Sequence, residues 1–180
     1  NFTGEIPMWF GHFPELQFLF LDGNGFSGFI PSSISNLSRV EKLDLSYNFL
    51  EGNIPEKIGN LSVLRELYLS GDDLVGQIPL SLCKFSQRQV LDLSNNRLSG
   101  QIPKEIGNLE KLKELYLITN NLTGNKFALS LYTHMVKQRL IVFFSLFDTR
   151  IRKACSSEIK RYMHTIYTIQ MKSNKDMHGF

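Results

Sequence analysis

The sequence predicts an α/β repeat solenoid, in which short parallel strands stack into one sheet and each strand is followed by a turn and a short helical segment. Two observations lead to this fold class. The pattern L-x-L-x-x-N-x-L-x-G-x-I-P occupies residues 43–55 and 91–103, and a near copy lies between them at 67–79. The copies begin at Leu43, Leu67 and Leu91, and a fixed 24-residue period is typical of repeat architectures.

The repeats stay in register over most of the chain. Four full units cover 16–39, 40–63, 64–87 and 88–111, and a partial unit flanks them at each end. We therefore assign residues 1–124 to the solenoid. Residues 125–180 lack the pattern, and we expect them to form a non-repeat basic tail that is misannotated or poorly ordered.

Each repeat begins with two leucines separated by one residue, which predicts a short half-buried strand with its leucines facing inward. These columns are Leu19, Leu43, Leu67, Leu91 and Leu115, then Leu21, Leu45, Leu69, Leu93 and Leu117. An asparagine follows these leucines in most repeats. Its short amide side chain can form hydrogen bonds with the backbone groups of a buried turn. This column is Asn24, Asn48, Asn96 and Asn120, with Asp72 in the third unit. A carboxylate accepts but does not donate, so we expect this ladder to be weakest at Asp72.

The second half of each repeat carries a glycine, an Ile-Pro pair and two apolar residues three positions apart. The glycines predict a tight bend or a close approach to a neighbour, the Ile-Pro pairs a second extended segment, and the apolar pairs a 3₁₀ or short helical turn. The glycine column is Gly28, Gly52, Gly76, Gly100 and Gly124, and the Ile-Pro pairs lie at 30–31, 54–55, 78–79 and 102–103.

Over residues 1–124 this pattern resembles the plant extracellular class of leucine-rich repeat, with consensus LxxLxxLxLxxNxLxGxIPxxLxxL. The resemblance implies a right-handed superhelix with a concave parallel sheet and a second short sheet from the L-x-G-x-I-P segments. Members of this family usually continue into a cap with paired cysteines, a transmembrane helix and a kinase. None of these is expected in this chain, so a Ser/Thr kinase would belong to the parent receptor only.

The net charge of +3 averages two unlike parts. Residues 1–124 hold 10 Lys and Arg against 14 Asp and Glu, whereas residues 125–180 hold 10 against 3. The basic residues of the tail are scattered rather than gathered in a run, so no nucleic-acid partner is expected. Two explanations of the tail stay open: read-through into intron or frameshifted sequence, and an amphipathic helix that caps the last repeat.

The apolar stretch 127–147 has the length of a transmembrane helix, but His134, Lys137 and Arg139 near its centre argue against one. We therefore expect contact with a membrane only through a transmembrane helix of the parent protein. Within this stretch, 140–147 is uncharged and β-prone, which makes it an aggregation hazard if exposed.

Residues 23–28 spell G-x-G-x-x-G, the pattern of a nucleotide-binding loop. Such a loop needs a following helix or a lysine on a nearby strand, whereas Ile30-Pro31 and a serine-rich turn follow here. Asn24 and Gly28 also belong to columns filled in the same way in other repeats. We interpret the motif as part of the repeat.

No catalytic constellation stands out, and we expect no enzyme activity from this chain. The histidines lack metal-ligand spacing, and two cysteines, Cys83 and Cys155, make neither a disulfide framework nor a metal site. No metal and no cofactor are predicted.

The outward positions of the predicted concave strands are the candidate ligand-binding residues, because aromatic anchors among polar groups dominate binding energies. One column follows the first strand leucine and the other precedes it. They are Phe20, Asp44, Tyr68, Asp92 and Tyr116, and Phe18, Lys42, Glu66, Val90 and Glu114. The alternative is that this face is merely solvated in these repeats.

The N-x-[S/T] pattern marks Asn36, Asn60 and Asn121 as candidate glycosylation sites. Asn108 shares the column of Asn36 and Asn60 without being an acceptor, so turn chemistry also favours asparagine there.

The resemblance implies a piece of the ectodomain of a plant receptor-like kinase that perceives signals in defence or development. Its partners would be a peptide or protein ligand, with a co-receptor as a further candidate, at the extracellular side of the plasma membrane. Two alternatives stay open. One is a kinase-less receptor-like protein or a secreted, apoplastic inhibitor of cell-wall enzymes, and the other is a non-functional gene fragment.

Overall fold

A computed structural model of the protein describes residues 1–84, 87–123 and 141–143. The chain divides into two compact units, Asn1–Ser145 and Leu146–Phe180, and every described residue lies in the first. Predictions for other residues, including most of the apolar stretch 127–147 and the two explanations of the tail, lie outside the described residues.

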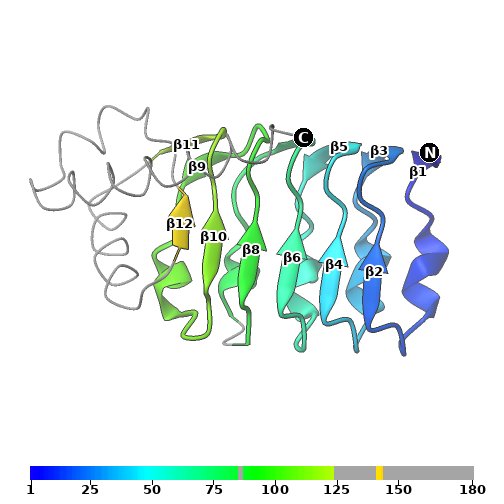
Figure 1. Ribbon diagram of the computed structural model, residues 1–180, viewed down its shortest axis with the longest axis horizontal. Coiled ribbons are helices and arrows are strands. Elements are labelled where there is room, and N and C mark those ends of the chain that lie inside the picture. Colours follow the sequence, from blue (N-terminus) through cyan, green and yellow to red (C-terminus); the bar gives the residue numbers. More distant parts are fainter. Residues whose placement is uncertain (85–86, 124–140, 144–180) are drawn as a thin grey trace, which may run out of the picture. The chain divides into compact units, whose positions relative to one another are not determined.

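The main sheet is parallel and gains one strand from each repeat (Figure 1). Its order is β12-β10-β8-β6-β4-β2, and neighbouring strands pair leucine with leucine, as in Leu43 with Leu67. The strands are β2 (Phe18–Phe20), β4 (Lys42–Asp44), β6 (Glu66–Tyr68), β8 (Val90–Asp92), β10 (Glu114–Tyr116) and β12 (Ile141–Phe143). The predicted sheet and its repeat register are confirmed through β10. This is the predicted concave face, and we call it the concave sheet.

The glycine-containing segments form the predicted second set of parallel strands (Figure 1). One sheet has the order β1-β3-β5-β7, and β9 pairs with β11. These strands are β1 (Thr3–Glu5), β3 (Gly25–Phe29), β5 (Phe49–Asn53), β7 (Asp73–Val75), β9 (Ser99–Gln101) and β11 (Asn121–Thr123). Because β3 takes up most of the G-x-G-x-x-G motif, the structure confirms its interpretation as part of a repeat.

A 3₁₀ helix completes each described repeat, as the apolar pairs predict. The helices are η1 (Met8–His12), η2 (Ser32–Asn36), η3 (Glu56–Asn60), η4 (Leu80–Cys83) and η5 (Lys104–Asn108). The proline of each Ile-Pro pair stands immediately before its helix, with φ between −68° and −59°. Proline suits this place because its ring fixes φ near this value and the first helical turn needs no N–H donor there.

The core is one continuous cluster that runs through the repeats between the two sets of strands and the helices. Leu43, Leu67, Leu91 and Leu115 are fully buried, whereas Leu19 of the first full repeat keeps 6 % of its surface exposed. Each buried leucine contributes roughly 1.5–3 kcal/mol relative to exposure, so stacking of repeats supplies most of the stability.

The asparagine ladder is present and joins successive repeats. The side-chain Oδ1 of Asn48 accepts the Phe26 N–H at 3.0 Å, and Asn96 Oδ1 accepts the Leu74 N–H at 3.0 Å. Each bond reaches back into the preceding repeat. Asp72 keeps this contact, with its Oδ1 2.9 Å from the Leu50 nitrogen, but its Oδ2 has no hydrogen-bond partner among the described residues. The predicted weak point of the ladder is confirmed.

One strand of the concave sheet was not expected from the repeat pattern. β12 pairs with β10 in parallel, with Ile141 opposite Glu114 and Phe143 opposite Tyr116. One repeat period from Glu114 would end at Gln138, so Ile141 lies out of the repeat register. The boundary placed at residue 124 stays a prediction, although β12 extends the sheet beyond it.

Candidate ligand-binding face

The candidate residues lie on adjacent strands of the concave sheet, on either side of a buried leucine. Because side chains of a strand alternate between its faces, the residues before and after Leu67 point away from the core. The strand register places Asp44 beside Tyr68, and Tyr68 beside Asp92. The structure therefore brings both predicted columns together as two parallel rows; their role in binding stays a prediction.

Two tyrosine–glutamate pairs recur on this face. The Tyr68 hydroxyl donates to Glu66 Oε2 at 3.1 Å, and the Tyr116 hydroxyl donates to Glu114 Oε2 at 2.8 Å. Burial raises the pKa of Tyr68 well above its usual value, and the neighbouring Glu66 raises it further. The pKa of Tyr116 is raised in the same way by burial and by Glu114. Both phenols therefore stay neutral donors, and each holds its glutamate in a fixed orientation.

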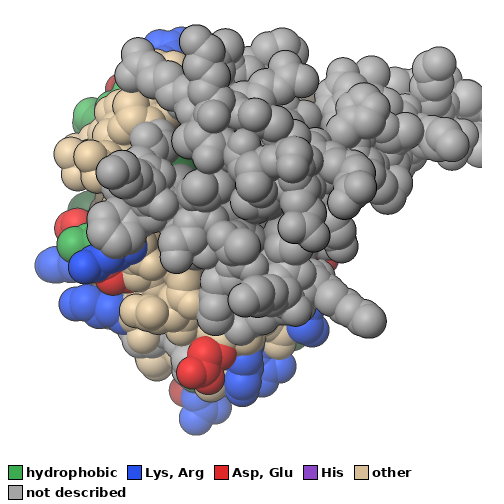
Figure 2. All heavy atoms as spheres, turned by 90° about the vertical axis from the view of Figure 1, so that its left-hand side faces the viewer, with side chains coloured by type: hydrophobic (Ala, Val, Ile, Leu, Met, Phe, Trp, Pro, Cys, Tyr) green, Lys and Arg blue, Asp and Glu red, His purple; other side chains and the backbone are tan. Residues whose placement is uncertain are grey.

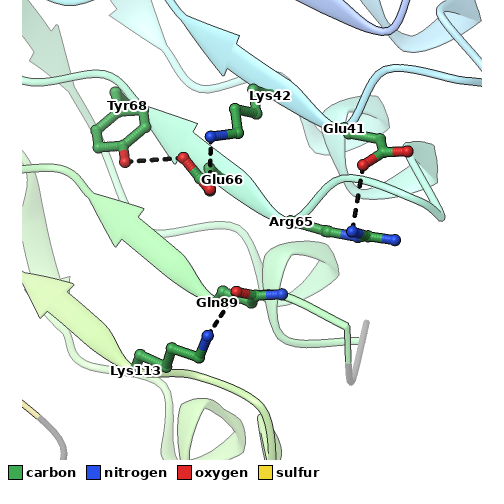
Figure 3. A network of polar contacts seen from close by, with 7 residues as sticks. All are labelled: Glu41, Lys42, Arg65, Glu66, Tyr68, Gln89 and Lys113. Atoms are coloured by element: carbon green, nitrogen blue, oxygen red, sulfur yellow. Dashed lines mark hydrogen bonds and ion pairs between the residues drawn. The ribbon is translucent and has the colours of Figure 1, made fainter.

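A lysine pairs with the negative charge of the glutamate in only the first of these pairs. Lys42 Nζ lies 3.0 Å from Glu66 Oε1, so Glu66 bridges Lys42 and Tyr68 (Figure 3). Glu114 has no such lysine in the corresponding place, because the preceding strand carries Val90 there. Val90 is only 7 % exposed, so its side chain offers little surface and we leave it out of the proposed face.

Asp44 and Asp92 have a structural task as well as a place on the face. Oδ1 of Asp44 accepts the Ser46 N–H at 3.0 Å, and Oδ1 of Asp92 accepts the Ser94 N–H at 2.9 Å. Burial raises the pKa of Asp44, and the negative charges of Asp22 and Asp92 add to this, while hydrogen bonds from Ser46 lower it. These aspartates fix the turn that follows each strand, and Ser94 is itself buried.

Phe18 and Phe20 form an exposed aromatic pair at the start of the face. Their rings are stacked, with centroids 6.4 Å apart and planes 3° apart, and both side chains are about half exposed. Exposed aromatic rings are enriched at binding surfaces because they bury a large area with few rotatable bonds.

A further row of polar pairs runs beside the face, each joining adjacent repeats. Arg65 lies 3.3 Å from Glu41, and Lys113 donates to Gln89 at 2.9 Å (Figure 3). In the view towards β12, basic and acidic side chains are likewise interspersed along the visible edge of the described surface (Figure 2). These contacts are largely solvent-exposed, so we expect them to contribute less than about 1 kcal/mol each.

The three candidate glycosylation sites are accessible at different places in the repeat. Asn36 and Asn60 end helices η2 and η3, one repeat apart, and Asn121 begins β11. Accessibility agrees with modification at all three, which stays a prediction.

No group of three or more His, Cys, Asp and Glu side chains among the described residues is arranged to hold a metal ion. Cys83 is a buried free thiol. Within the same part of the chain, none of the helices has the length and apolar character needed to cross a bilayer.

Sequence reasoning missed two features near the face. Arg88 occupies the apolar column of Val40, Leu64 and Leu112, is fully buried, and finds no hydrogen-bond partner for its guanidinium among the described residues. The turn after each concave strand also needs a left-handed residue. Gly23 and Gly71 meet this need, but so do Tyr47, Asn95 and Thr119, at φ 56°, 52° and 55°. The mixture of residue types in this column hid the requirement.

These features define a repeat solenoid whose parallel sheet carries polar and aromatic side chains on its outward face. Comparison with known proteins gives the family. The sequence pattern of the family described as "Leucine rich repeat" matches residues 14–74, and a second "Leucine Rich Repeat" pattern matches 89–109. No curated protein matches the chain.

Solved structures that resemble the chain include plant receptor ectodomains. The leucine-rich-repeat ectodomain of the receptor kinase SOBIR1 from Arabidopsis thaliana is 30% identical, with a TM-score of 0.61, covering 71% of this chain and 67% of that one. The ectodomain of GASSHO1/SCHENGEN3 from Arabidopsis thaliana, in complex with CASPARIAN STRIP INTEGRITY FACTOR 2, is 38% identical, with a TM-score of 0.66, covering 73% of this chain and 16% of that one. The Arabidopsis receptor kinase HAESA, in complex with the peptide hormone IDA and the co-receptor SERK1, is 39% identical, with a TM-score of 0.63, covering 68% of this chain and 20% of that one.

The chain belongs to the plant extracellular leucine-rich-repeat family of receptor ectodomains. It spans a fifth or less of the length of the GASSHO1/SCHENGEN3 and HAESA chains.

Proposed function

We propose that the concave sheet recognises an extended, positively charged segment of a peptide or protein, as part of a plant receptor. The observation that carries this proposal is the repeated Tyr–Glu pair on β6 and β10. Each pair presents an oriented carboxylate beside an aromatic ring, and Asp92 lies on the strand between them. Carboxylates with aromatic neighbours suit lysine or arginine side chains through ion pairs and cation–π contacts.

The spacing of the strands sets a length scale for the ligand. Neighbouring strands lie about 4.8 Å apart, so β6 and β10 are separated by roughly 10 Å. A ligand in the extended polyproline II conformation has three residues per turn and advances about 3.1 Å per residue, so side chains three positions apart lie on one side of it, roughly 9 Å apart, and would reach both pairs. The complex of HAESA with the peptide hormone IDA and the co-receptor SERK1 supports a peptide as the ligand class and a co-receptor as a further partner.

A cell-surface location follows from the same proposal, because the similar chains are ectodomains of plant membrane receptors. We propose that this chain works on the extracellular side of the plasma membrane, where Asn36, Asn60 and Asn121 would carry glycans. A role in defence or development belongs to the proposal in the same way. Binding needs neither a metal nor a cofactor.

A peptide titration tests the proposed function. Extended peptides with two lysines three positions apart are titrated against the full chain, with a glutamate-substituted peptide as the charge control. We expect the lysine peptide to bind and the double variant Tyr68→Ala/Tyr116→Ala to weaken it at least about tenfold, which corresponds to about 1.4 kcal/mol.

The matched control is Phe49→Ala, an exposed aromatic residue on β5 of the other sheet. We expect this variant to leave the affinity unchanged. Equal affinities for the two peptides, or an unaltered affinity in the double variant, would contradict the proposal that the concave sheet binds the ligand.

A further inference from the structure

The asparagine ladder donates as well as accepts, and both halves hold adjacent repeats together. The Asn48 amide donates to the carbonyl of Leu21 in the preceding repeat at 3.0 Å, and to Leu45 and Ser46 in its own turn at 2.8 and 3.1 Å. Asn96 repeats this arrangement, with Leu69 of the preceding repeat at 2.6 Å. An amide side chain therefore serves two turns at once.

Asp72 stands between these two asparagines and keeps only the accepting half. Its Oδ1 accepts the Leu50 N–H, while its Oδ2 is buried without a partner among the described residues. By analogy with Asn48, this second oxygen takes the place of the asparagine amide nitrogen. An amide nitrogen at this position would donate to the carbonyls of Leu45, Leu69 and Ser70. A carboxylate offers these carbonyls only repulsion, whereas a carboxylic acid has an O–H to donate.

We propose that Asp72 is a proton-operated latch between the repeats 40–63 and 64–87. As a carboxylic acid it donates its one O–H to a carbonyl of the turn and restores a donated bond to the ladder, and as a carboxylate it leaves the ladder open on one side. The latch would act in the same way whichever ligand the concave sheet binds.

The surroundings favour the protonated form. Burial raises the pKa of Asp72 to about 6, the N–H groups of Leu50 and Asn48 oppose this, and the charges of Asp73 and Asp44 add to it. Arg97, a basic residue of the following repeat, pairs with Asp73 at 2.7 Å rather than with Asp72.

The other ionisable groups on the flanking turns do not reverse this balance. Tyr47 precedes the ladder asparagine of the earlier repeat, and a phenol carries no positive charge in either of its forms. Asp92 begins the turn of the later repeat and is itself an acid, bonded to Ser94. Every acidic neighbour therefore favours a proton on Asp72.

The direction of the pH effect follows from linkage. An aspartate in the unfolded chain has a pKa of about 4, so between about pH 4 and pH 6 the folded protein holds a proton that the unfolded chain has lost. The free energy of unfolding therefore falls as pH rises through this window, and the loss is complete above it. The hydrogen bonds between the repeats 40–63 and 64–87, which carry Asp44 and Tyr68 of the candidate face, are therefore most complete at low pH.

Melting of the full chain and of Asp72→Asn at pH 4.5 and pH 7.5 tests the latch. Because asparagine donates at every pH, we expect the variant to melt higher than the natural protein by about 5 °C at pH 7.5. The difference should shrink by more than half at pH 4.5. A difference that is equal at both pH values, or absent at pH 7.5, overturns the proposal.

Two matched variants separate the latch from general charge effects. Asp73→Asn removes the exposed neighbouring acid and should show no such pH-dependent gain. Asn96→Asp should lower the melting temperature at pH 7.5 more than at pH 4.5, because it creates a second carboxyl group in the ladder. If Asp73→Asn reproduces the effect of Asp72→Asn, the effect is one of net charge and the latch is excluded.

A carbon NMR titration of the Asp72 carboxyl group, assigned by its disappearance in Asp72→Asn, gives a direct reading. We expect a midpoint near pH 6. A midpoint at or below pH 4.5 overturns the proposal whatever the melting curves show.

Discussion

The ring of Phe29 lies over the backbone of Gly52 in the next repeat, where a β-carbon would meet the Cδ1 and Cε1 atoms of the ring. The same contact recurs along the second sheet, with Glu5 over Gly28, Asn53 over Gly76 and Gln77 over Gly100. The glycine column is therefore a contact surface between repeats as well as a bend. Both functions need the absence of a side chain.

Replacing Gly52 with alanine should destabilise the protein by about 2–4 kcal/mol. The backbone at Gly52 has φ 75°, which costs an alanine about 1–2 kcal/mol, and displacing the Phe29 ring adds overpacking. Urea unfolding measures the change. Gly4→Ala is the matched control, because Gly4 has φ 89° but a β-carbon there would have no atom within 4 Å. If the two variants lose equal stability, the contact with Phe29 has no energetic role.

Replacing Leu67 with alanine should cost about 2–5 kcal/mol, because Leu67 is fully buried in the centre of the stacked sheet. The readout is the shift of the unfolding midpoint at constant slope. Val63→Ala, at a residue that is 40% exposed, should change stability by less than about 0.5 kcal/mol. An unshifted midpoint in the leucine variant would contradict the assigned register.

Replacing Arg88 with leucine should stabilise the protein by about 1–3 kcal/mol. The buried guanidinium loses its hydration, which lowers the pKa of Arg88 to about 10 but leaves it charged at neutral pH. Leucine restores the residue type of this column. Thermal melting at pH 7 gives the comparison, with Arg39→Leu as the control because the Arg39 side chain is 64% exposed. A fall in stability in Arg88→Leu would mean that the guanidinium makes favourable contacts.

Replacing Thr119 with asparagine should stabilise the protein by about 1 kcal/mol. Thr119 is a β-branched residue at φ 55°, a region that asparagine tolerates much better. Asn95 occupies the same place one repeat earlier at φ 52°, so Asn95→Thr is the reciprocal test and should lose a similar amount. Effects of the same sign in both variants would show that backbone strain is not the cause.

The period of the chain was enough to predict the inward leucine strands, the 3₁₀ helices and the ladder, because each depends on contacts that recur once in every repeat, whereas the second sheet was implied by the resemblance to the family. The period could not predict β12, whose Ile141 pairs with Glu114 three positions beyond the place that the period assigns. A strand outside the period has no column in which to be recognised. The buried Arg88 was visible as a basic residue in an apolar column, but its burial depended on the neighbours that stack over it.

The candidate face was predictable as a set of positions but not as a set of interactions. Alternation along a strand places Glu66 and Tyr68 on one face, yet it does not show that the hydroxyl of one orients the carboxylate of the other. The burial of Val90 was likewise hidden, because alternation predicts direction and not the bulk of neighbouring side chains.

The ion pairs that join adjacent repeats depend on the order of the repeats. Arg39 pairs with Glu15, Arg65 with Glu41, and Lys42 with Glu66, each partner one unit away in its column. A tandem duplication of 40–63 would place Glu41 beside a second Glu41 and Lys42 beside a second Lys42. The units are thus alike in shape but not in charge, and a gene that gained or lost a repeat here would bring like charges together at the new junction.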